Sequence, residues 1–332
     1  MANNTSIKVY VDISEALPPL FLITDALFRD VLSKYPNLEQ RFDYQIGKGE
    51  DSFLQGVKDA DVLVGWDFPT GNLHKNASRL QWIQLIGAGL DHLLPLDWLP
   101  SGITLTTGSG SHRPKADEFM MLSLLMLNNR IPEIVDNQQK RVHKVTYSSV
   151  ITGKTVLLVG LGATGTAAAQ SARKLGLKVI GIRHSKAPHP DVDEVYGPQE
   201  LRSLLPQADF VIMTVPKTRH TIGLMGRNEL QSMKRGAGLI NLSRHEIIDE
   251  DALADLLTDG HLTGAIYDLE DPEQVPSNPR LWSTDKIIIA PHCLTNDPET
   301  FMVNGLSLFF ENLERYLSNK PLHNQVNPES QY

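Results

Sequence analysis

The feature that most constrains the fold is a glycine pattern in the middle of the chain, Gly160-x-Gly162-x-x-Gly165. An apolar run, Thr155–Val159, precedes it and is typical of a buried strand. An alanine-rich run of helical character, 166–175, follows it. A strand, a glycine turn and a helix in this order are typical of a dinucleotide-binding unit, whereas the glycines alone are a weak signal. A glycine turn without a ligand is the alternative interpretation.

Each glycine of this pattern has a separate expected task. Gly160 makes the tight turn, Gly162 lets the backbone approach a pyrophosphate, and Gly165 permits close packing of the helix. The N-terminus of that helix is expected to bind the phosphates through its free N–H groups and its dipole. The predicted cofactor contacts in this loop are Gly160, Gly162, Ala163, Thr164 and Gly165.

The end of the next strand bears on which dinucleotide binds. The predicted strand 178–183 runs into Arg183, His184 and Ser185, where NAD sites usually carry an Asp or Glu on the ribose hydroxyls. That carboxylate is missing, and guanidinium and hydroxyl donors suit a 2′-phosphate instead. NADP(H) is therefore favoured over NAD(H). The alternative is that Arg183 stacks on adenine or lies in solvent.

Strands and helices alternate along two separate parts of the chain. Before residue 112 the β-rich runs are Ile7–Val11, Ala60–Val64, Leu80–Leu85 and Ile103–Leu105. Later in the chain, strands are expected near 155–160, 178–183, 209–215, 238–242, 262–268 and 286–290. A chain of 332 residues also exceeds the usual size of one core. The sequence thus predicts an α/β fold with two doubly wound parallel sheets.

Two helices are expected outside these alternating parts. Residues 115–127 are apolar nearly all round, which predicts a buried helix packed between domains rather than a methionine-rich cofactor box. Residues 298–317 form an amphipathic pattern after the last strand. Because this tail has no sheet of its own, we expect it to return and complete the first domain. The predicted division is therefore 1–112 with 293–332, and 113–292.

Composition excludes several classes of protein. The net charge of −8 and the pI near 5.8 disfavour a broad surface for DNA or RNA. No apolar run is long enough to span a bilayer, and the first residues lack the pattern of a secretory signal. A single cysteine, Cys293, excludes an internal disulfide, and the histidines lack metal-ligand spacing. We expect a cytoplasmic protein with no metal and no nucleic-acid or membrane partner.

Polar side chains follow three of the later strands. Arg244 follows one apolar run, Glu273 comes shortly after the next, and His292 follows the last. Ligands of open α/β sheets bind beyond the carboxyl ends of the strands, so we expect these side chains in one crevice. An Arg binds a carboxylate, a His transfers a proton, and a carboxylate holds the imidazolium, which suits hydride transfer to a 2-keto acid. Each residue taken alone is more often structural.

The order and spacing of these residues resemble the D-isomer-specific 2-hydroxyacid dehydrogenases over almost the whole chain. The matching segments are Gly87–Asp91, Ser109–Glu118, Gly160–Gly165, Val215–Thr218, Asn241–Arg244, Asp249–Leu253, Asp268–Glu273, Pro291-His292 and Asn312–Leu317. The resemblance implies a Rossmann cofactor domain and a flavodoxin-like substrate domain with a cleft between them. It also implies a homodimer formed through the cofactor domains.

The resemblance further implies a role for each candidate site residue. Arg244 would bind the substrate carboxylate, His292 would be the acid/base, and Glu273 would pair with His292. Asp268 would hold the nicotinamide amide. The implied substrate contacts are Ala88, Gly89, His112 and Arg244. The further cofactor contacts are Val215, Pro216, Thr221, Leu242, Ser243 and Asp268.

Several positions depart from the common pattern of the family. His245 stands where Gly usually follows the Arg, so we expect a different loop backbone or a bulky group facing the cofactor. Arg113 is interpreted either as a contact to a doubly anionic substrate or as a solvated charge near the hinge. The remaining departures are Asp117, Arg141–His143, Thr164 and Glu270.

The sequence favours reduction of a small 2-keto acid by NADPH, with glyoxylate and hydroxypyruvate as the first candidates. A cofactor-sensing, corepressor-like interaction protein on the same fold is the alternative, because one fold hosts many functions. Cofactor binding without turnover would favour that alternative.

Overall fold

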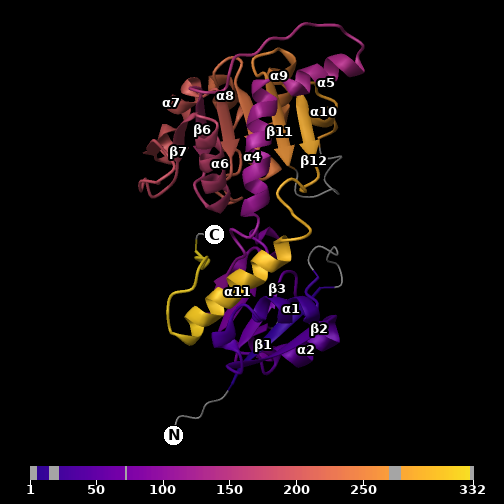
Figure 1. The fold of residues 1–332 in the computed structure, drawn as a ribbon, viewed down its shortest axis with the longest axis vertical. Helices are drawn as coiled ribbons and strands as arrows, with labels where there is room; N and C mark the ends of the chain where they lie inside the picture. The colour runs from indigo at the N-terminus through magenta and orange to yellow at the C-terminus, as the bar shows by residue number, and fades with distance from the viewer. Residues whose placement is uncertain (1–5, 15–21, 72, 269–277, 330–332) are drawn as a thin grey trace. The chain divides into compact units, whose positions relative to one another are not determined.

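The computed structural model describes residues 6–14, 22–71, 73–268 and 278–329 (Figure 1). The chain divides into two compact units. Unit 1 comprises Met1–His112 and Asp297–Tyr332, and unit 2 comprises Arg113–Asn296. Residues 293–296 thus fall in unit 2, unlike in the predicted division, because Cys293 still donates its N–H to Asp268 of unit 2. Each unit is built on one parallel sheet, which confirms the predicted fold class.

The sheet of unit 1 has, among the described residues, five parallel strands in the order β2-β1-β3-β4-β5. The strands are β1 (Ile7–Ile13), β2 (Phe42–Lys48), β3 (Val62–Gly65), β4 (Trp82–Leu85) and β5 (Thr104–Thr106). This order is flavodoxin-like. β2 has no counterpart among the predicted strands, because it lies at the sheet edge and alternates apolar residues with exposed polar ones such as Asp43.

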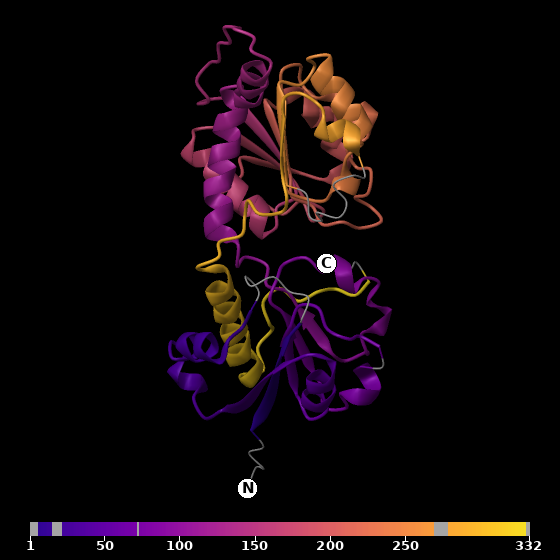
Figure 2. The same ribbon diagram turned by 90° about the vertical axis from the view of Figure 1, so that its right-hand side faces the viewer.

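Both faces of the unit 1 sheet are covered by helices (Figure 2). The helices are α1 (Asp25–Leu32), α2 (Glu50–Val57), α3 (Leu73–Asn76) and α11 (Phe301–Leu317). Val9 and Val11 of β1 pack with α1 and α11, whereas Tyr10 between them packs with α2 and α3. Phe310 of α11 contacts Phe28 of α1 edge to face, with ring centroids 5.0 Å apart. The tail helix is therefore part of the core of unit 1.

The sheet of unit 2 has, within the described part of the chain, seven parallel strands in the order β12-β11-β10-β9-β6-β7-β8. They are β6 (Thr155–Val159), β7 (Lys178–Ile182), β8 (Glu194–Tyr196), β9 (Phe210–Met213), β10 (Gly238–Asn241), β11 (Gly264–Asp268) and β12 (Ile287–Ala290). The order from β8 to β11 is that of a Rossmann sheet, and β12 extends it. The sequence predicts six of these strands and misses β8, a three-residue edge strand that begins with a charged side chain.

Side chains of β6 alternate between two helical layers. The helices of unit 2 are α4 (Arg113–Asn128), α5 (Ile131–Gln139), α6 (Ala163–Lys174), α7 (Leu201–Leu204), α8 (Arg227–Ser232), α9 (Glu250–Thr258) and α10 (Pro279–Trp282). Val156 and Leu158 pack with α4 and α6, whereas Leu157 and Val159 pack with the layer that contains α7 to α10. Strands buried on both faces are continuous apolar runs, which is why the sequence predicts them well.

Helix α4, which the sequence predicts as a buried helix because its residues are apolar nearly all round, is buried on one side only. Its buried residues include Phe119, Met120, Leu124 and Leu127. Leu122 and Leu125 are exposed instead. The apolar pattern therefore has two causes, the core on one side of α4 and an uncovered apolar stripe on the other.

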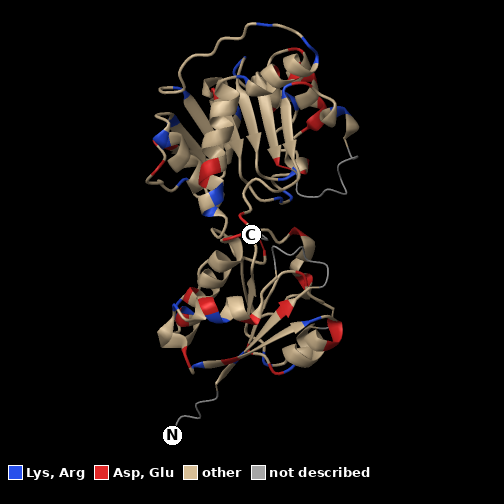
Figure 3. Ribbon diagram, turned by 45° about the vertical axis from the view of Figure 1, so that its right-hand side comes forward, with Lys and Arg blue, Asp and Glu red and all other residues tan. Residues whose placement is uncertain are grey.

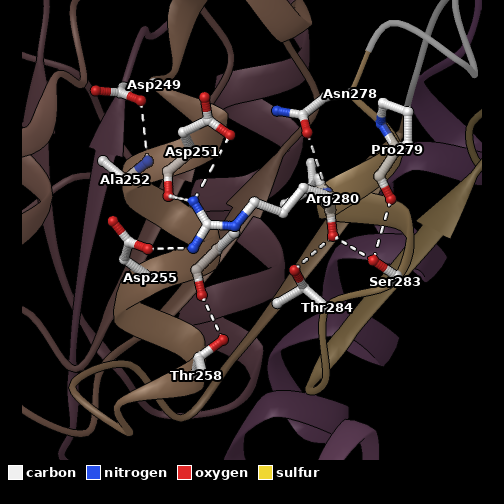
Figure 4. Close-up of polar contacts among 12 residues, drawn as sticks. Asp249, Asp251, Ala252, Asp255, Thr258, Asn278, Pro279, Arg280, Ser283 and Thr284 are labelled. Atoms are coloured by element: carbon white, nitrogen blue, oxygen red, sulfur yellow. Dashed lines mark hydrogen bonds and ion pairs between the residues drawn. The ribbon is translucent and has the colours of Figure 1, made fainter.

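The short helix α10 is fixed to α9 by charged contacts (Figure 4). Arg280 pairs with Asp255 and lies 3.8 Å from Asp251. Asp249 caps α9 by accepting a hydrogen bond from the N–H of Ala252 at 2.9 Å. A cap of this kind stabilises a helix by about 1 kcal/mol. These contacts hold the segment that leads into β12.

Charged residues are distributed over both units. Figure 3 shows Lys and Arg interspersed with Asp and Glu on the helices and loops of each unit. In the part of the chain that the structure describes, no helix has the length and apolar character needed to cross a membrane. The described residues also contain no group of three or more His, Cys, Asp or Glu arranged to hold a metal ion.

Asp12, near the end of β1, is a buried carboxyl with a side-chain environment that penalises its charge. The residue is only 5 % exposed. Burial, together with the charge of Asp67, raises the pKa of Asp12 from 3.8 to about 7. A carboxyl whose pKa is raised by folding stabilises the protein while it is protonated, and this contribution is lost as the pH rises through the folded-state pKa.

Asp12→Asn should raise the melting temperature relative to the wild type by more at pH 8 than at pH 4.5, because the amide carries no charge to bury. A gain of 1 kcal/mol corresponds to a shift of about 2–4 °C in a chain of this size. Thermal unfolding at both pH values measures the difference, with the exposed Asp43→Asn as the control. An effect of Asp12→Asn that is the same at both pH values would contradict this account.

Candidate active site

The glycine loop follows β6 and opens α6, where the sequence predicts it. Gly160 has a φ of 107°, which L side chains rarely adopt, so this residue can make the tight turn. A Cβ on Gly165 would lie 2.2 Å from the carbonyl oxygen of Gly160. The absence of a side chain at Gly165 is therefore what lets α6 approach the end of β6.

The start of α6 fits the pyrophosphate of a dinucleotide. A Cβ on Gly162 would meet no atom within 4 Å, so space is open above this residue. Gly162 is also the N-cap of α6, and no described side chain caps the first-turn N–H groups. Ala163 and Thr164 belong to that first turn. Free N–H groups at a helix N-terminus bind phosphate oxygens well.

Residues 183–185, which follow β7, are joined to β8 by a backbone hydrogen bond, and their side chains are exposed or half-buried. Arg183 donates its backbone N–H to the carbonyl of Tyr196 at 3.0 Å, and its side chain is half-buried. His184 and Ser185 are exposed. Among the described residues, no carboxylate forms an ion pair with the Arg183 guanidinium. This group is thus available for an anion such as a 2′-phosphate.

The loop after β9 is rigidified by hydroxyl groups. Thr221 donates its hydroxyl to the carbonyl of Pro216 at 2.6 Å and accepts the N–H of Thr218 at 2.8 Å. Val215 is half-buried at the start of this loop. The hydroxyl of Thr221 therefore shapes the loop that contains the predicted cofactor contacts.

Asp268 ends β11, the strand between those that precede Arg244 and His292. β10, β11 and β12 are neighbours in the sheet, so the loops that contain Arg244, Asp268 and His292 start at one edge. Asp268 Oδ2 lies 3.9 Å from Nδ1 of His292. Asp268 is 4 % exposed, and burial raises its pKa to about 7, although backbone N–H groups and Arg244 act in the opposite direction. The structure thus brings these three side chains into one polar group.

His292 adopts an unusual backbone conformation for a residue with a side chain. Its φ of 46° lies in the left-handed region, which costs roughly 1–3 kcal/mol unless the surroundings fix it. Asn296 donates its side-chain N–H to the carbonyl of His292 at 3.0 Å, and Cys293 donates its backbone N–H to Asp268 at 3.2 Å. The turn that presents the imidazole is therefore fixed from both sides.

The loop of Arg244 is organised by Asn241, a residue to which sequence reasoning gave no role. Asn241 is fully buried at the end of β10, where its Oδ1 accepts the N–H of Ser243 at 2.9 Å. Its side-chain N–H donates to the carbonyl of Arg244 at 3.2 Å. The Arg244 guanidinium donates to the carbonyl of Ser243 at 2.9 Å. A polar residue that ends an otherwise apolar strand is the signal that could have revealed Asn241.

His245, the departure next to Arg244, contacts a carboxylate of its own loop. Its Nε2 lies 3.4 Å from Glu246, which also pairs with Lys217 of the loop after β9. Burial would raise the pKa of Glu246, but the hydrogen bonds from Lys217 and backbone N–H groups, with the charge of His245, lower it overall. The loops after β9 and β10 are thus joined by an ion pair. Of the other predicted contacts there, Leu242 is half-buried and Ser243 is buried.

The remaining predicted residues lie elsewhere in the chain. In unit 1, Ala88 and Gly89 are half-buried after β4, and the ring of His112 contacts that of Phe301 in a tilted arrangement, with ring centroids 4.5 Å apart. Glu273, predicted to pair with His292, and the departure Glu270 lie outside the described residues.

Comparison with known proteins identifies the family of this chain. The model of the NAD binding domain of the D-isomer specific 2-hydroxyacid dehydrogenases matches residues 120–293. The chain belongs to the D-isomer specific 2-hydroxyacid dehydrogenase family. The resemblance predicted from the sequence is thereby confirmed, and the matched part of this family member contains the glycine loop and all three described polar residues.

Relatives of this family member include glyoxylate reductases and D-3-phosphoglycerate dehydrogenases. A glyoxylate reductase of Korarchaeum cryptofilum is 26 % identical over 299 residues, which cover 86 % of this chain and 89 % of that protein. A D-3-phosphoglycerate dehydrogenase of Methanocaldococcus jannaschii is 26 % identical over 315 residues, which cover 92 % of this chain but only 59 % of that longer protein.

Solved structures of the family share the fold. A D-isomer specific 2-hydroxyacid dehydrogenase of Xanthobacter autotrophicus Py2, in complex with NADPH and MES, aligns with a TM-score of 0.82 and 23 % identity, covering 98 % of this chain and 99 % of that one. The NADPH-dependent glyoxylate/hydroxypyruvate reductase of Sinorhizobium meliloti, in complex with NADP and sulfate, has a TM-score of 0.79 and 22 % identity, with coverage of 98 % and 100 %.

Two glycine substitutions should separate binding from folding. Gly162→Ala should leave the melting temperature unchanged but weaken NAD(P)H binding about tenfold or more, because the new methyl group enters the space expected for the pyrophosphate. Gly165→Ala should instead destabilise the protein by about 1–3 kcal/mol, because its methyl group would overlap backbone. Thermal unfolding and fluorescence titration with NADPH and NADH test both. Unchanged NAD(P)H binding in Gly162→Ala would show that the pyrophosphate does not bind at this loop.

Proposed function

We propose that this chain reduces a small 2-keto acid to the D-2-hydroxy acid with NADPH and catalyses the reverse reaction, with glyoxylate and hydroxypyruvate as the first candidates. The observation that carries the proposal is the grouping of Arg244, Asp268 and His292 at neighbouring strand ends in a member of this family. A guanidinium, a carboxylate and an imidazole suit hydride transfer to a keto acid. The names of relatives, including the glyoxylate reductases, support the substrate class.

Each residue has one task in the proposed reaction. Arg244 binds the substrate carboxylate and stabilises the negative charge that develops on the keto oxygen. His292 donates a proton to that oxygen during reduction and removes it in the reverse direction. Glu273 pairs with the imidazolium form of His292. The bound nicotinamide supplies the hydride. The His292 side chain is 39 % exposed, which lets the imidazole exchange its proton with solvent.

Asp268 has a separate task, which is to hold the amide of the nicotinamide. Because burial raises its pKa to about 7, the carboxyl is a hydrogen-bond donor below that pH and only an acceptor above it. Both forms can bind a carboxamide, which has a donor and an acceptor of its own.

We favour NADP(H) over NAD(H) as the cofactor. Arg183, with His184 and Ser185 beside it, stands at the strand end where a ribose-binding carboxylate is otherwise usual. Two of the structures with the same fold were solved with NADPH or NADP.

The experiment that tests this function is the initial rate of NADPH oxidation, and separately of NADH oxidation, with a panel of 2-keto acids. The panel contains glyoxylate, hydroxypyruvate, pyruvate, phenylpyruvate and 2-oxoglutarate. Turnover with NADPH preferred is the expected result. Faster turnover with NADH would reject the role of Arg183 and keep the catalytic proposal. Binding of a dinucleotide without turnover of any acid would favour a cofactor-sensing protein.

His292→Ala should lower kcat by about 10²- to 10⁴-fold on every acid that the wild type reduces, because it removes the proton donor. NADPH affinity should stay within about twofold, since the imidazole acts on the substrate. Steady-state kinetics and a fluorescence titration measure the two effects. His74→Ala, at an exposed histidine of unit 1, is the control. Near-wild-type turnover in His292→Ala would overturn the mechanism.

We further propose a homodimer formed through unit 2. Exposed apolar side chains lie on α4, on α5 and in the segment 140–150. This segment leads away from α5 (Figure 1). The exposed apolar residues are Leu122, Leu125, Ile134, Val135, Val142, Val145, Tyr147 and Val150. Glu133 is buried and pairs with Lys144 at 2.8 Å, which holds this segment in place. Exposed apolar surface of this extent is typical of a protein interface.

Val145→Asp combined with Tyr147→Asp should convert the dimer to a monomer, because a second copy would then have to bury two unpaired carboxylates. Light scattering after size-exclusion chromatography gives the mass directly. Leu54→Asp, at an exposed leucine of α2, is the matched control and should leave the mass unchanged. A wild type that is monomeric at micromolar concentration would reject the proposed dimer.

A further inference from the structure

The residues that follow Arg183–Ser185 are tied to α6 by two side-chain contacts one helical turn apart. His189 Nε2 lies 3.0 Å from the hydroxyl of Thr166. Asp191 accepts a hydrogen bond from the side-chain N–H of Gln170 at 2.8 Å. The segment 183–192, which contains the predicted 2′-phosphate contacts, is therefore joined directly to the helix that starts at the glycine loop.

The two hydrogen bonds of His189 fix the position of its proton. Nδ1 receives the backbone N–H of Asp191 at 3.2 Å, and a backbone N–H can only donate. In the neutral ring the proton is then on Nε2, which donates to the Thr166 hydroxyl. Thr166 in turn donates its own hydroxyl hydrogen to the carbonyl of Gly162 at 2.8 Å. A continuous chain of hydrogen bonds thus runs from Asp191 to the residue that caps α6.

Gln170, which contacts Asp191, also contacts Arg113, the first residue of unit 2. Gln170 donates its side-chain N–H to Asp191, so its Oε1 is the acceptor for the guanidinium of Arg113 at 2.5 Å. Both polar atoms of this amide are therefore used. The structure thus gives Arg113, which sequence reasoning left between substrate contact and solvated charge, a defined partner on α6.

The far end of the segment is anchored separately. Asp193 accepts the N–H of Val179 at 2.8 Å and donates its own N–H to the carbonyl of the same residue at 2.9 Å. Lys186 pairs with Glu200 at 2.9 Å. Asp193 also pairs with Arg173 of α6 at 3.2 Å. Within the segment 183–192, His189 and Asp191 are therefore the side chains whose polar contacts join it to α6, and His189 is the nearer of the two to Arg183–Ser185.

We propose that His189 is a positioning residue for the cofactor: by joining segment 183–192 to the glycine loop through Thr166, it sets the preference for the 2′-phosphorylated dinucleotide. The inference rests on the proposed function, because it assumes that the pyrophosphate binds at Gly162 and the 2′-phosphate at Arg183. The two phosphate groups belong to one molecule, so both bind well only if their sites are held at a fixed separation. NADH makes no such demand, since it has no 2′-phosphate.

Three substitutions at His189 test the bridge. His189→Ala removes both hydrogen bonds, His189→Asn keeps an acceptor for the Asp191 N–H, and His189→Gln keeps a donor that reaches Thr166. Kd values for NADPH and NADH are measured separately by fluorescence titration, together with the melting temperature and with kcat at saturating NADPH. Arg183→Ala is the reference for loss of the phosphate contact, and His74→Ala is the neutral control.

We expect His189→Ala and His189→Asn to weaken NADPH binding roughly 2- to 10-fold, the range of one hydrogen bond, and to change NADH binding less than about 2-fold. His189→Gln should retain most of the NADPH affinity, and kcat should stay near the wild-type value in all three. Equal losses for the two dinucleotides, or the same loss in all three variants, would overturn the inference and assign His189 a structural role. A wild type that binds neither dinucleotide would instead overturn the proposed function.

Discussion

The burial of the central unit 2 strands on both faces is the constraint on which the candidate site depends. β6, β9, β10 and β11 are covered by helices on either side, so their backbones have to pair with parallel neighbours along their full length. At the ends of these strands the chain leaves the sheet, and polar side chains there can contact water or a ligand. Arg244, Asp268 and the glycine loop stand at the carboxyl ends of three of these strands, and His292 follows the edge strand β12. Pairing between the parallel strands fixes the spacing of these residues.

The loops above that ladder are made rigid by buried polar groups. Asn241 forms hydrogen bonds with the backbone of Ser243 and Arg244, and Asp268 accepts the N–H of Cys293 in the turn after His292. A carboxyl in such a place titrates near neutral pH because it is desolvated, whereas its backbone partners favour the charged form. The same residues that order the loops therefore also determine the electrostatics around the imidazole.

Much of this arrangement could be predicted from the sequence, since apolar runs and glycine spacing are local signals. The central strands, the glycine loop and the strand-end residues were accessible in this way. The strands β2 and β8 were not, because exposed or half-buried polar side chains interrupt the apolar run in β2 and leave no such run in the three residues of β8. The roles of Arg113 and Asn241 depend on partners distant in sequence or on loop geometry, which no local pattern encodes. The exposed apolar residues of α4 could not be predicted either, because the sequence does not distinguish an apolar side chain in a core from one on an exposed surface.

The return of α11 to unit 1 has a consequence for biosynthesis. Unit 1 begins the chain, yet one face of its sheet, including Val9 and Val11, is covered by a helix that ends at Leu317. Unit 2 is continuous, so all of its residues emerge from the ribosome before α11 does. Of the two units, the one whose synthesis starts first is therefore the last to be completed. Until α11 is synthesised, α1 covers only part of this apolar sheet face, and the exposed remainder is the kind of surface that chaperones bind.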